Sequence, residues 1–274
     1  TLGMVLRAEN IGSILQAIGL VSFSIYLSKN MDLYKTIYLR LFVLSSPVLI
    51  FLVSGHKPQL FPEVMTAIAL QLTVTNKKID KKIFVLICVL IMGAAQQKLS
   101  FVLTGGVIGC WALWKALSHS RMAIIFGLIS FIFFFTPRGL WNLQQLTEYS
   151  LIGFFTPLPE QFTDGLRGFR ENQWWFPFNL FVPSSIGTIT TVLGFQFFLV
   201  FLVKTSNSKF REALLVTCIA ASLTYLLGQS IARSFYEFVL WSAVAFSFLT
   251  EKEFDFRLYN SFLAAQGVAV LVLG

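Results

Sequence analysis

The sequence predicts an all-α fold, a polytopic transmembrane helix bundle of about ten membrane helices with one long outward-facing loop. Three observations predict it. Of the 274 residues, 56% are hydrophobic and only 12% are charged, whereas about a quarter of the residues in a soluble domain are charged. The hydrophobic residues gather in runs separated by short polar turns. One segment, residues 137–185, is too polar and too rich in proline to lie in hydrocarbon.

Ten apolar runs provide the expected helices. They cover residues 11–27, 36–53, 61–75, 83–95, 99–117, 122–136, 186–203, 213–227, 231–249 and 258–274. Several are shorter than the about 20 residues of a straight span, so flanking residues or a thinner bilayer must make up the difference. The run at 61–75 is the weakest, because Pro62, Glu63 and Gln71 dilute it. A re-entrant segment is the alternative there.

Basic residues alternate in number from one connection to the next. Of the 21 lysines and arginines, thirteen follow odd-numbered runs, seven follow even-numbered runs or precede the first, and Arg40 lies inside a run. The thirteen are Lys29, Lys35, Lys77, Lys78, Lys81, Lys82, Lys115, Arg121, Lys204, Lys209, Arg211, Lys252 and Arg257. Cytoplasmic connections carry the excess of positive charge. We therefore expect these connections in the cytoplasm.

The same alternation assigns residues 137–185 to the extracytoplasmic side. Five prolines interrupt any regular element there, and the many tryptophan and phenylalanine side chains suit a boundary between membrane and water. A connection of this length is normally functional or disordered, and the aromatic content argues against disorder. The chain begins at Thr1, not at a methionine, and ends in an apolar run. We expect a single transmembrane domain over residues 1–274, taken from a longer protein.

Composition and motifs exclude several classes of function. The net charge of +8 is scattered over short connections and provides no basic face, so nucleic acid is not an expected partner. Cys88, Cys110 and Cys218 all lie in apolar runs, where a thiol packs as a small hydrophobic group. Phosphate-binding loops, nucleophile elbows and HExxH zinc motifs are missing, and two histidines cannot form a multi-histidine centre. The sequence therefore predicts no metal site.

Charged residues at the outward ends of the runs are the candidates for chemistry, because a charge at membrane depth is costly and usually has a partner or a role. Arg233 and Glu237 stand four residues apart on one predicted helix face. They form either a structural ion pair or a phosphate site in which Glu237 orients Arg233, whose planar guanidinium suits phosphate. Lys98 occupies a short outward turn, where it either extends its ammonium to the surface or contacts a lipid phosphate.

Two further sites lie at outward ends of the runs, and the two interpretations given for Lys98 apply to the first of them. Arg138 and Asn142 follow Pro137 at the end of the sixth run. Glu63 follows Pro62 at the head of the third run, and taken singly it is more readily explained as a solvated surface group than as a catalytic base. Several acids and basic groups that face one aqueous pocket nevertheless fit chemistry on a charged lipid headgroup.

The order of these features resembles the polytopic glycosyltransferases of the GT-C fold. Residues 44–64 are similar to the segment in which a helix of that family ends in Ser-Pro and an outward turn leads to an acidic residue. Residues 94–101 resemble its short turn with a lysine, and residues 135–159 resemble its pattern of Pro, Arg, Asn, Gly and Pro after a mid-chain helix. Residues 228–238 are similar to its late helix, which opens with Gln and Arg.

The resemblance implies transfer of a sugar from a polyprenyl-phosphate-linked donor to an acceptor on the extracytoplasmic face. The family's main catalytic carboxylate lies in the first outer loop, which by the topology above would be upstream of Thr1. The other roles are assigned to residues of this chain. Arg233, Lys98 and Arg138 are expected to bind the phosphate, Glu237 and Asn142 to orient these basic side chains, and Glu63 to serve as a second acid. No cofactor is indicated, and either a basic side chain or a divalent cation would stabilise the departing phosphate.

Two other classes of function stay open. One is a non-catalytic integral membrane subunit that scaffolds a larger complex through its helices and its outer loop. The other is a transporter, which is less favoured because the runs contain few mid-membrane charges and no paired inverted halves. In each case the expected location is the bacterial inner membrane, with membrane lipids, and for the enzyme the polyprenyl-phosphate sugar, as partners.

Overall fold

The computed structural model describes residues 11–29, 31–54, 59–98, 100–146, 178–181, 192–226 and 234–273. Within these ranges the fold is helical, which confirms the all-α class, and the one β-type contact is an isolated bridge between Ile79 and Ala116. The α-helices are α2 (Ile11–Leu27), α3 (Leu33–Leu44), α4 (Val48–Ser54), α5 (Leu60–Thr75), α6 (Lys81–Gln97), α7 (Phe101–Trp114), α8 (His119–Phe134), α9 (Pro137–Leu146), α11 (Ser208–Leu226), α12 (Tyr236–Ser247) and α13 (Phe256–Leu273). Two 3₁₀ segments are η3 (Phe178–Leu180) and η5 (Phe195–Leu202).

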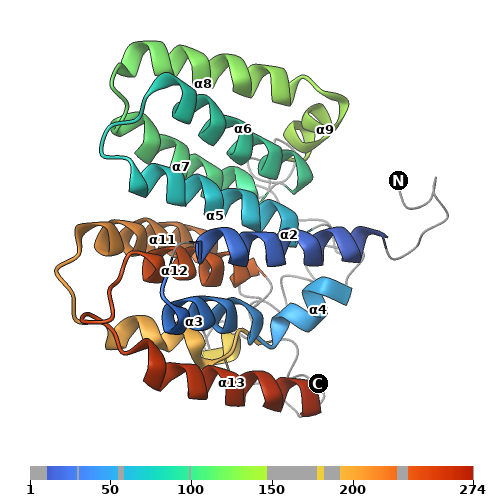
Figure 1. The fold of residues 1–274 in the computed structure, drawn as a ribbon. Helices are drawn as coiled ribbons and strands as arrows, with labels where there is room; N and C mark the ends of the chain where they lie inside the picture. The colour runs from blue at the N-terminus through green and yellow to red at the C-terminus, as the bar shows by residue number, and fades with distance from the viewer. Residues whose placement is uncertain are drawn as a thin grey trace.

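The helices form a stack with α5 and α12 inside it and with α8 and α13 at its two outer edges (Figure 1). α5 packs against α2, α6, α7, α11 and α12. Every residue of α12 is buried, as expected for a helix that is apolar on all sides. The run expected at 61–75 is α5, an unbroken helix at the centre of the bundle.

The run expected at 36–53 is divided into two helices at a proline. α3 ends at Leu44 and α4 begins at Val48, because Pro47 has no N–H to donate and disfavours a helical residue before it. The hydroxyl of Ser46 donates to the carbonyl of Leu193 at 2.6 Å. This hydrogen bond joins the connection between α3 and α4 to the residues just before η5. The Ser-Pro helix end expected from the sequence is present.

Five connections expected on the cytoplasmic side meet at one end of the bundle, on the left of Figure 1, and we call it the basic end. They are residues 28–32, 76–80, 115–118, 203–207 and 248–255. The bridge between Ile79 and Ala116 joins the second to the third. Lys115 then reaches the first turns of α11, where it pairs with Glu212 at 2.8 Å.

Hydrogen bonds also join the connection at 203–207 to the connection at 248–255. The amide of Asn207 donates to the carbonyl of Phe248 at 2.9 Å, and the hydroxyl of Thr205 donates to the carboxylate of Glu253. The Thr205 hydroxyl, with the backbone N–H of Thr250, lowers the pKa of the Glu253 carboxyl below its ordinary value. Lys35, at the start of α3, donates at 2.6 Å to two carbonyls at the end of α12, where a cation complements the helix dipole.

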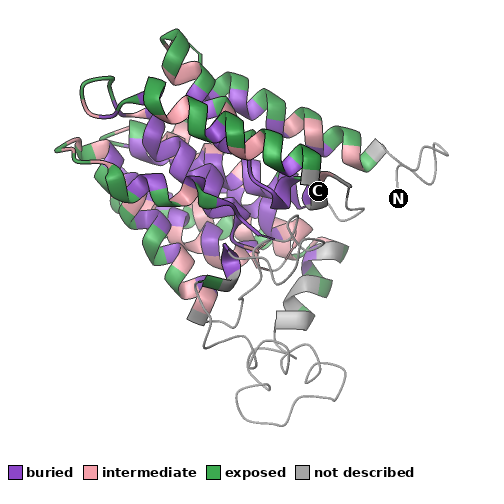
Figure 2. Ribbon diagram, turned by 90° about the horizontal axis from the view of Figure 1, so that it is seen from below, coloured by how far each residue is buried: buried purple, intermediate pink, exposed green. Residues whose placement is uncertain are grey.

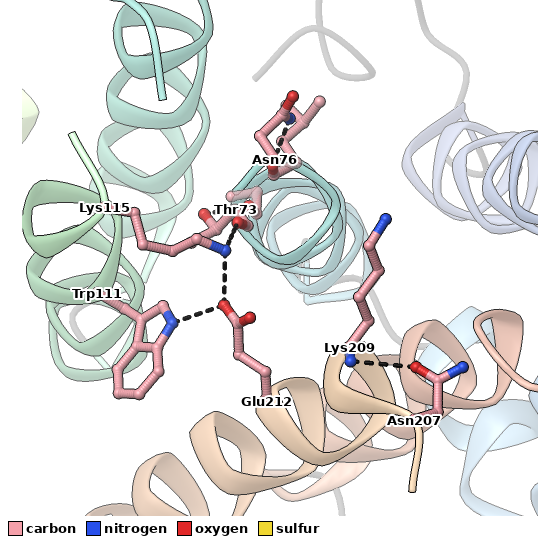
Figure 3. A network of polar contacts seen from close by, with 9 residues as sticks. Thr73, Asn76, Trp111, Lys115, Asn207, Lys209 and Glu212 are labelled. Atoms are coloured by element: carbon pink, nitrogen blue, oxygen red, sulfur yellow. Dashed lines mark hydrogen bonds and ion pairs between the residues drawn. The ribbon is translucent and has the colours of Figure 1, made fainter. Parts of the chain in front are cut away.

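The ion pair at the basic end belongs to a small polar network (Figure 3). The ammonium of Lys115 donates to the Oε1 atom of Glu212 at 2.8 Å and to the carbonyl of Thr73 at 2.7 Å. The indole N–H of Trp111 donates to the same Oε1 atom at 2.8 Å. The network therefore joins α5, α7 and α11.

The stretch expected as an outward loop from residue 137 begins with a helix, α9 (Pro137–Leu146). Thr136 caps it, since its hydroxyl accepts from the N–H of Gly139 at 3.1 Å, and a proline at the first helical position suits the start of a helix. A side chain at position 139 would lie 2.2 Å from the carbonyl oxygen of Phe133. Glycine therefore lets α9 fold closely against the end of α8.

Buried residues fill the middle of the bundle, whereas exposed residues follow the outer sides of the peripheral helices (Figure 2). Among the residues that the structure describes, no helix combines the length and the apolar character needed to cross a membrane.

Replacing Lys115 by Met should lower the free energy of unfolding by about 2 kcal/mol, because Glu212 and the carbonyl of Thr73 lose their cationic donor. The double variant Lys115→Met/Glu212→Met should lose less than the sum of the two single variants, with a coupling of about 1 kcal/mol. Equilibrium chemical unfolding of the purified protein measures both quantities. The exposed Lys81→Met is the control, and additive effects of the two single changes would contradict the pairing.

Candidate functional site

Two buried carboxylates lie at the end of the bundle opposite the basic end. Glu63 is in the first turn of α5 and is 1% exposed, and Glu237 is in the first turn of α12 and is 3% exposed. The two helices that they begin pack against one another, and the charge of Glu237 acts on Glu63. Burying acidic groups costs free energy unless hydrogen bonds or a cation compensate. The hydrogen-bond donors and positive charges around the two carboxylates therefore determine their chemistry.

Thr66 links Glu237 to the rest of the core. Its hydroxyl lies 2.5 Å from the Oε1 atom of Glu237 and 3.0 Å from the carbonyl of Glu63. A hydroxyl has one proton, and the shorter contact assigns it to the carboxylate of Glu237. The same oxygen accepts from the indole N–H of Trp241 at 3.2 Å. Thr66 and Trp241 thereby hold one oxygen of Glu237 in a fixed position between α5 and α12.

Two glutamines surround Glu63. The amide of Gln59 donates to the Oε1 atom of Glu63 at 3.2 Å. The side-chain oxygen of Gln16, from α2, accepts from the backbone N–H groups of Gln59 and Leu60 at 3.0 and 3.1 Å, which fixes the start of α5. The second carboxylate oxygen of Glu63 is buried and finds no hydrogen-bond partner within the described residues. This oxygen is free to accept a proton or a hydrogen bond.

Lys98 provides a positive charge at the same end of the bundle as the two carboxylates. It follows the last residue of α6, and its backbone carbonyl accepts from the N–H of Phe101 at 3.1 Å, which forms the short turn into α7. Lys98 acts electrostatically on both Glu63 and Glu237. The structure therefore brings together three of the residues singled out from the sequence, which come from α5, α12 and the turn between α6 and α7.

The other candidates are only partly defined. The backbone of Arg138 lies in α9 at the same end of the bundle, since the amide of Gln96, near the end of α6, donates to the Thr136 hydroxyl at 2.8 Å. The side chains of Arg138 and Asn142 lie outside the described residues, and so does the whole of Arg233. The expected pair of Arg233 with Glu237 therefore stays a prediction.

The neutral side chains that form hydrogen bonds with the two carboxylates were not predicted from the sequence. The expectation for Glu63 taken singly, a solvated surface group, is wrong, because Pro62 and Glu63 lie inside the bundle. Thr66 is three residues after Glu63 and shares its helix face, and Gln16 is a polar residue within an apolar run. Polar residues at helical spacing from a carboxylate are a signal that could have found Thr66.

The cluster has defined chemical capabilities. A carboxylate oxygen with no other partner can take a proton from a hydroxyl, and an adjacent ammonium can balance an anionic group such as a phosphate. Within the described residues, no group of three or more histidine, cysteine, aspartate or glutamate side chains comes together as a metal site would require. Glu63 and Glu237 alone offer at most a two-carboxylate environment for a cation.

These features define a class of protein, an all-helical bundle that holds a buried carboxylate pair and a lysine at the end opposite its basic connections. The model of the DUF1420 N-terminal domain matches residues 1–273, and the chain belongs to this family. Neither the curated proteins nor the solved structures provide a significant match to the chain.

Replacing Thr66 by Val should lower the free energy of unfolding by about 2 kcal/mol, because the carboxylate of Glu237 loses a donor and the indole of Trp241 loses its acceptor. Thr66→Ser should keep most of the stability. The matched control is Thr73→Val on the same helix, since the Thr73 hydroxyl bonds only to a carbonyl of its own helix, that of Ala69 at 2.8 Å. Equal losses in the two valine variants, measured by equilibrium unfolding, would contradict the bridging role.

Proposed function

We propose that the chain is an integral membrane protein that transfers a sugar from a polyprenyl-phosphate-linked donor to an acceptor on the extracytoplasmic face. The observation that carries the proposal is the pair of buried carboxylates, Glu63 and Glu237, with the half-buried Lys98 at the same end of the bundle, opposite the basic connections.

Exposed apolar side chains on the peripheral helices support the membrane location. On α2, Ile14 and Ile18 are each 55% exposed, on α8 Ile132 is 64% exposed, and on α13 Leu271 is 78% exposed. Apolar surface of this extent is unfavourable in water and favourable in lipid. The helices α2, α5, α6, α8, α11 and α13 have 16 to 19 residues. This corresponds to about 24–28 Å, which is shorter than the hydrocarbon core of about 30 Å and would be accommodated by local thinning of the bilayer.

The orientation follows from the charge of the connections. Thirteen of the 21 lysines and arginines lie either in the five connections at the basic end or in the first turns of the helices that follow them, and positive connections stay in the cytoplasm. The opposite end, with the carboxylate cluster and α9, then faces outward. This is the side on which the GT-C glycosyltransferases that the sequence resembles act on polyprenyl-phosphate sugars.

In the proposed transfer, an acceptor hydroxyl attacks the anomeric carbon of the sugar while the bond from that carbon to the phosphate oxygen breaks. The hydroxyl proton passes to a carboxylate, and polyprenyl phosphate departs with the bonding electrons. The free oxygen of Glu63 is suited to assist as the second acid of the site. Lys98, together with Arg138 and Arg233, is expected to stabilise the negative charge of the phosphate.

A non-catalytic membrane subunit is the second candidate, and one observation favours it. Gln59 and Thr66, the hydrogen-bond partners of the two carboxylates, are neutral and buried. The same contacts would serve a purely structural junction between α5 and α12. The two candidates differ in their response to a carboxylate-to-amide change, which removes a proton acceptor but keeps the shape of the side chain.

Single cysteines should be labelled from opposite faces of the membrane in a variant in which Cys88, Cys110 and Cys218 are replaced by Ser. A membrane-impermeant maleimide should reach Trp141→Cys, on α9, in intact cells, and should reach Lys78→Cys only after the cells are permeabilised. The reason is that α9 and the connection at 76–80 lie at opposite ends of the bundle. Labelling of both positions from the same face would exclude the proposed orientation.

Glu63→Gln in the full-length protein should lower sugar transfer from polyprenyl-phosphate-linked hexoses and pentoses by about a hundredfold or more, because the second acid is lost. Binding of a photoreactive polyprenyl phosphate should be retained. Lys98→Gln and Arg233→Ala should weaken that binding as well as transfer, because both remove positive charge from the phosphate site. Assays in reconstituted membranes measure both quantities.

Lys78→Gln, at the basic end, is the matched control for Lys98→Gln and should leave transfer and binding unchanged. Melting temperatures of all the variants separate loss of activity from loss of fold. If the wild-type protein transfers no sugar, or if Glu63→Gln and Arg233→Ala transfer it at the wild-type rate, the enzymatic proposal fails. The scaffold is then the better description.

A further inference from the structure

A surface pocket at the basic end is separate from the carboxylate cluster. It has a volume of about 520 Å³ and lies between the linker after η5 and the first turns of α11. Its polar lining comes from Lys204, Thr205, Ser206 and Arg211. Apolar atoms of Phe210 and other side chains complete the wall. The pocket thus combines two cationic side chains with apolar side chains.

The two cations are available to a ligand. Lys204 and Arg211 are exposed, and neither forms an ion pair within the described part of the chain. The Nε atom of Arg211 donates to the carbonyl of Thr205 at 3.1 Å. This contact holds the guanidinium beside the pocket and leaves its terminal nitrogens for other acceptors. A fixed guanidinium loses less conformational freedom when it binds a phosphate.

Neighbouring carboxylates have other partners. Glu253 accepts from the hydroxyl of Thr205 and from the N–H and hydroxyl of Thr250. Glu212, next to Arg211 in the chain, pairs with Lys115 at the network of Figure 3. Both acids are satisfied without Lys204 and Arg211. The positive charge of the pocket is therefore not neutralised by an ion pair.

An apolar stripe continues from the pocket along α11. Arg211, Leu215 and Ile219 are spaced four residues apart and share one helix face. Leu215 is 50% exposed and Ile219 is 38% exposed. Phe201, which precedes the pocket on η5, is 73% exposed. A cation at the foot of an exposed apolar stripe matches a ligand with an anionic head and a hydrocarbon tail.

We infer that this pocket binds the phosphate of an anionic phospholipid from the cytoplasmic leaflet, with an acyl chain along Leu215 and Ile219. Arg211 donates two parallel hydrogen bonds to phosphate oxygens, and Lys204 adds a point charge. Basic pockets between membrane helices on the cytoplasmic side bind anionic headgroups in this way. The inference rests on the proposed membrane location and is independent of the proposed sugar transfer.

The test compares binding of phosphatidylglycerol and phosphatidylcholine to the full-length protein, by native mass spectrometry after extraction into detergent. The wild-type protein should prefer phosphatidylglycerol. Lys204→Gln/Arg211→Gln should raise the Kd for phosphatidylglycerol by about tenfold or more, since each cation near the headgroup contributes about 1 kcal/mol, or about fivefold in Kd. Lys77→Gln/Lys78→Gln removes the same charge from another basic-end connection and should change the Kd by less than about twofold.

Each result bears on the inference in a definite direction. Equal losses in the two double variants, or no preference of the wild-type protein for phosphatidylglycerol, would overturn it. Competition by millimolar glycerol 1-phosphate or inorganic phosphate would identify a soluble phosphate compound as the ligand, and would also overturn the lipid assignment. Weak or absent competition supports a ligand with an acyl chain.

The controls distinguish this site from the proposed function. Sugar transfer by Lys204→Gln/Arg211→Gln should stay at the wild-type level. If the enzymatic proposal fails, the inference of a lipid site is therefore not affected. A wild-type protein that does not float with phosphatidylglycerol vesicles on a density gradient would overturn both the membrane location and the lipid site.

Discussion

The contact between α5 and α12 is the constraint on which the rest of the bundle depends. α12 is buried along its whole length, so it must be enclosed by other helices, and α3, α5 and α11 pack around it. Its one acidic residue, Glu237, needs a donor in that interior, and Thr66 on α5 provides it. Because Thr66 also accepts from Trp241, a single hydroxyl fixes the position of α12 relative to α5.

Much of the fold could be predicted from the sequence, because apolar runs and charge alternation are local patterns. The all-α class followed from the runs, whereas the run at 36–53 was expected as one helix and only the family resemblance indicated a helix end at Ser-Pro. Two features were not predicted. Residues 137–146 form α9, because Thr136 caps the helix and the other prolines of the stretch lie after its end. α5 is central although Glu63 and Gln71 dilute its hydrophobicity, because five other helices pack against it.

The candidate site was predictable only in part, since spacing along a helix identifies a face but not the helix that faces it. Glu63, Glu237 and Lys98 were singled out because charge at membrane depth is costly. Their meeting at one end of the bundle depends on packing between helices that are distant in sequence. Thr66 and Gln16 are ordinary polar residues until that packing is known.

The enclosure of α12 has a consequence for how the protein is made. The hydroxyl of Tyr236 bonds the carbonyl of Val43, 193 residues away, and the amide of Asn260 bonds the carbonyl of Tyr34, 226 residues away. Contacts so distant in sequence form late and slow the approach to the native state. During synthesis, the inner faces of α3 and α5 therefore stay uncovered until α12 and α13 have left the ribosome. A chaperone that shields those faces would protect the chain during this interval.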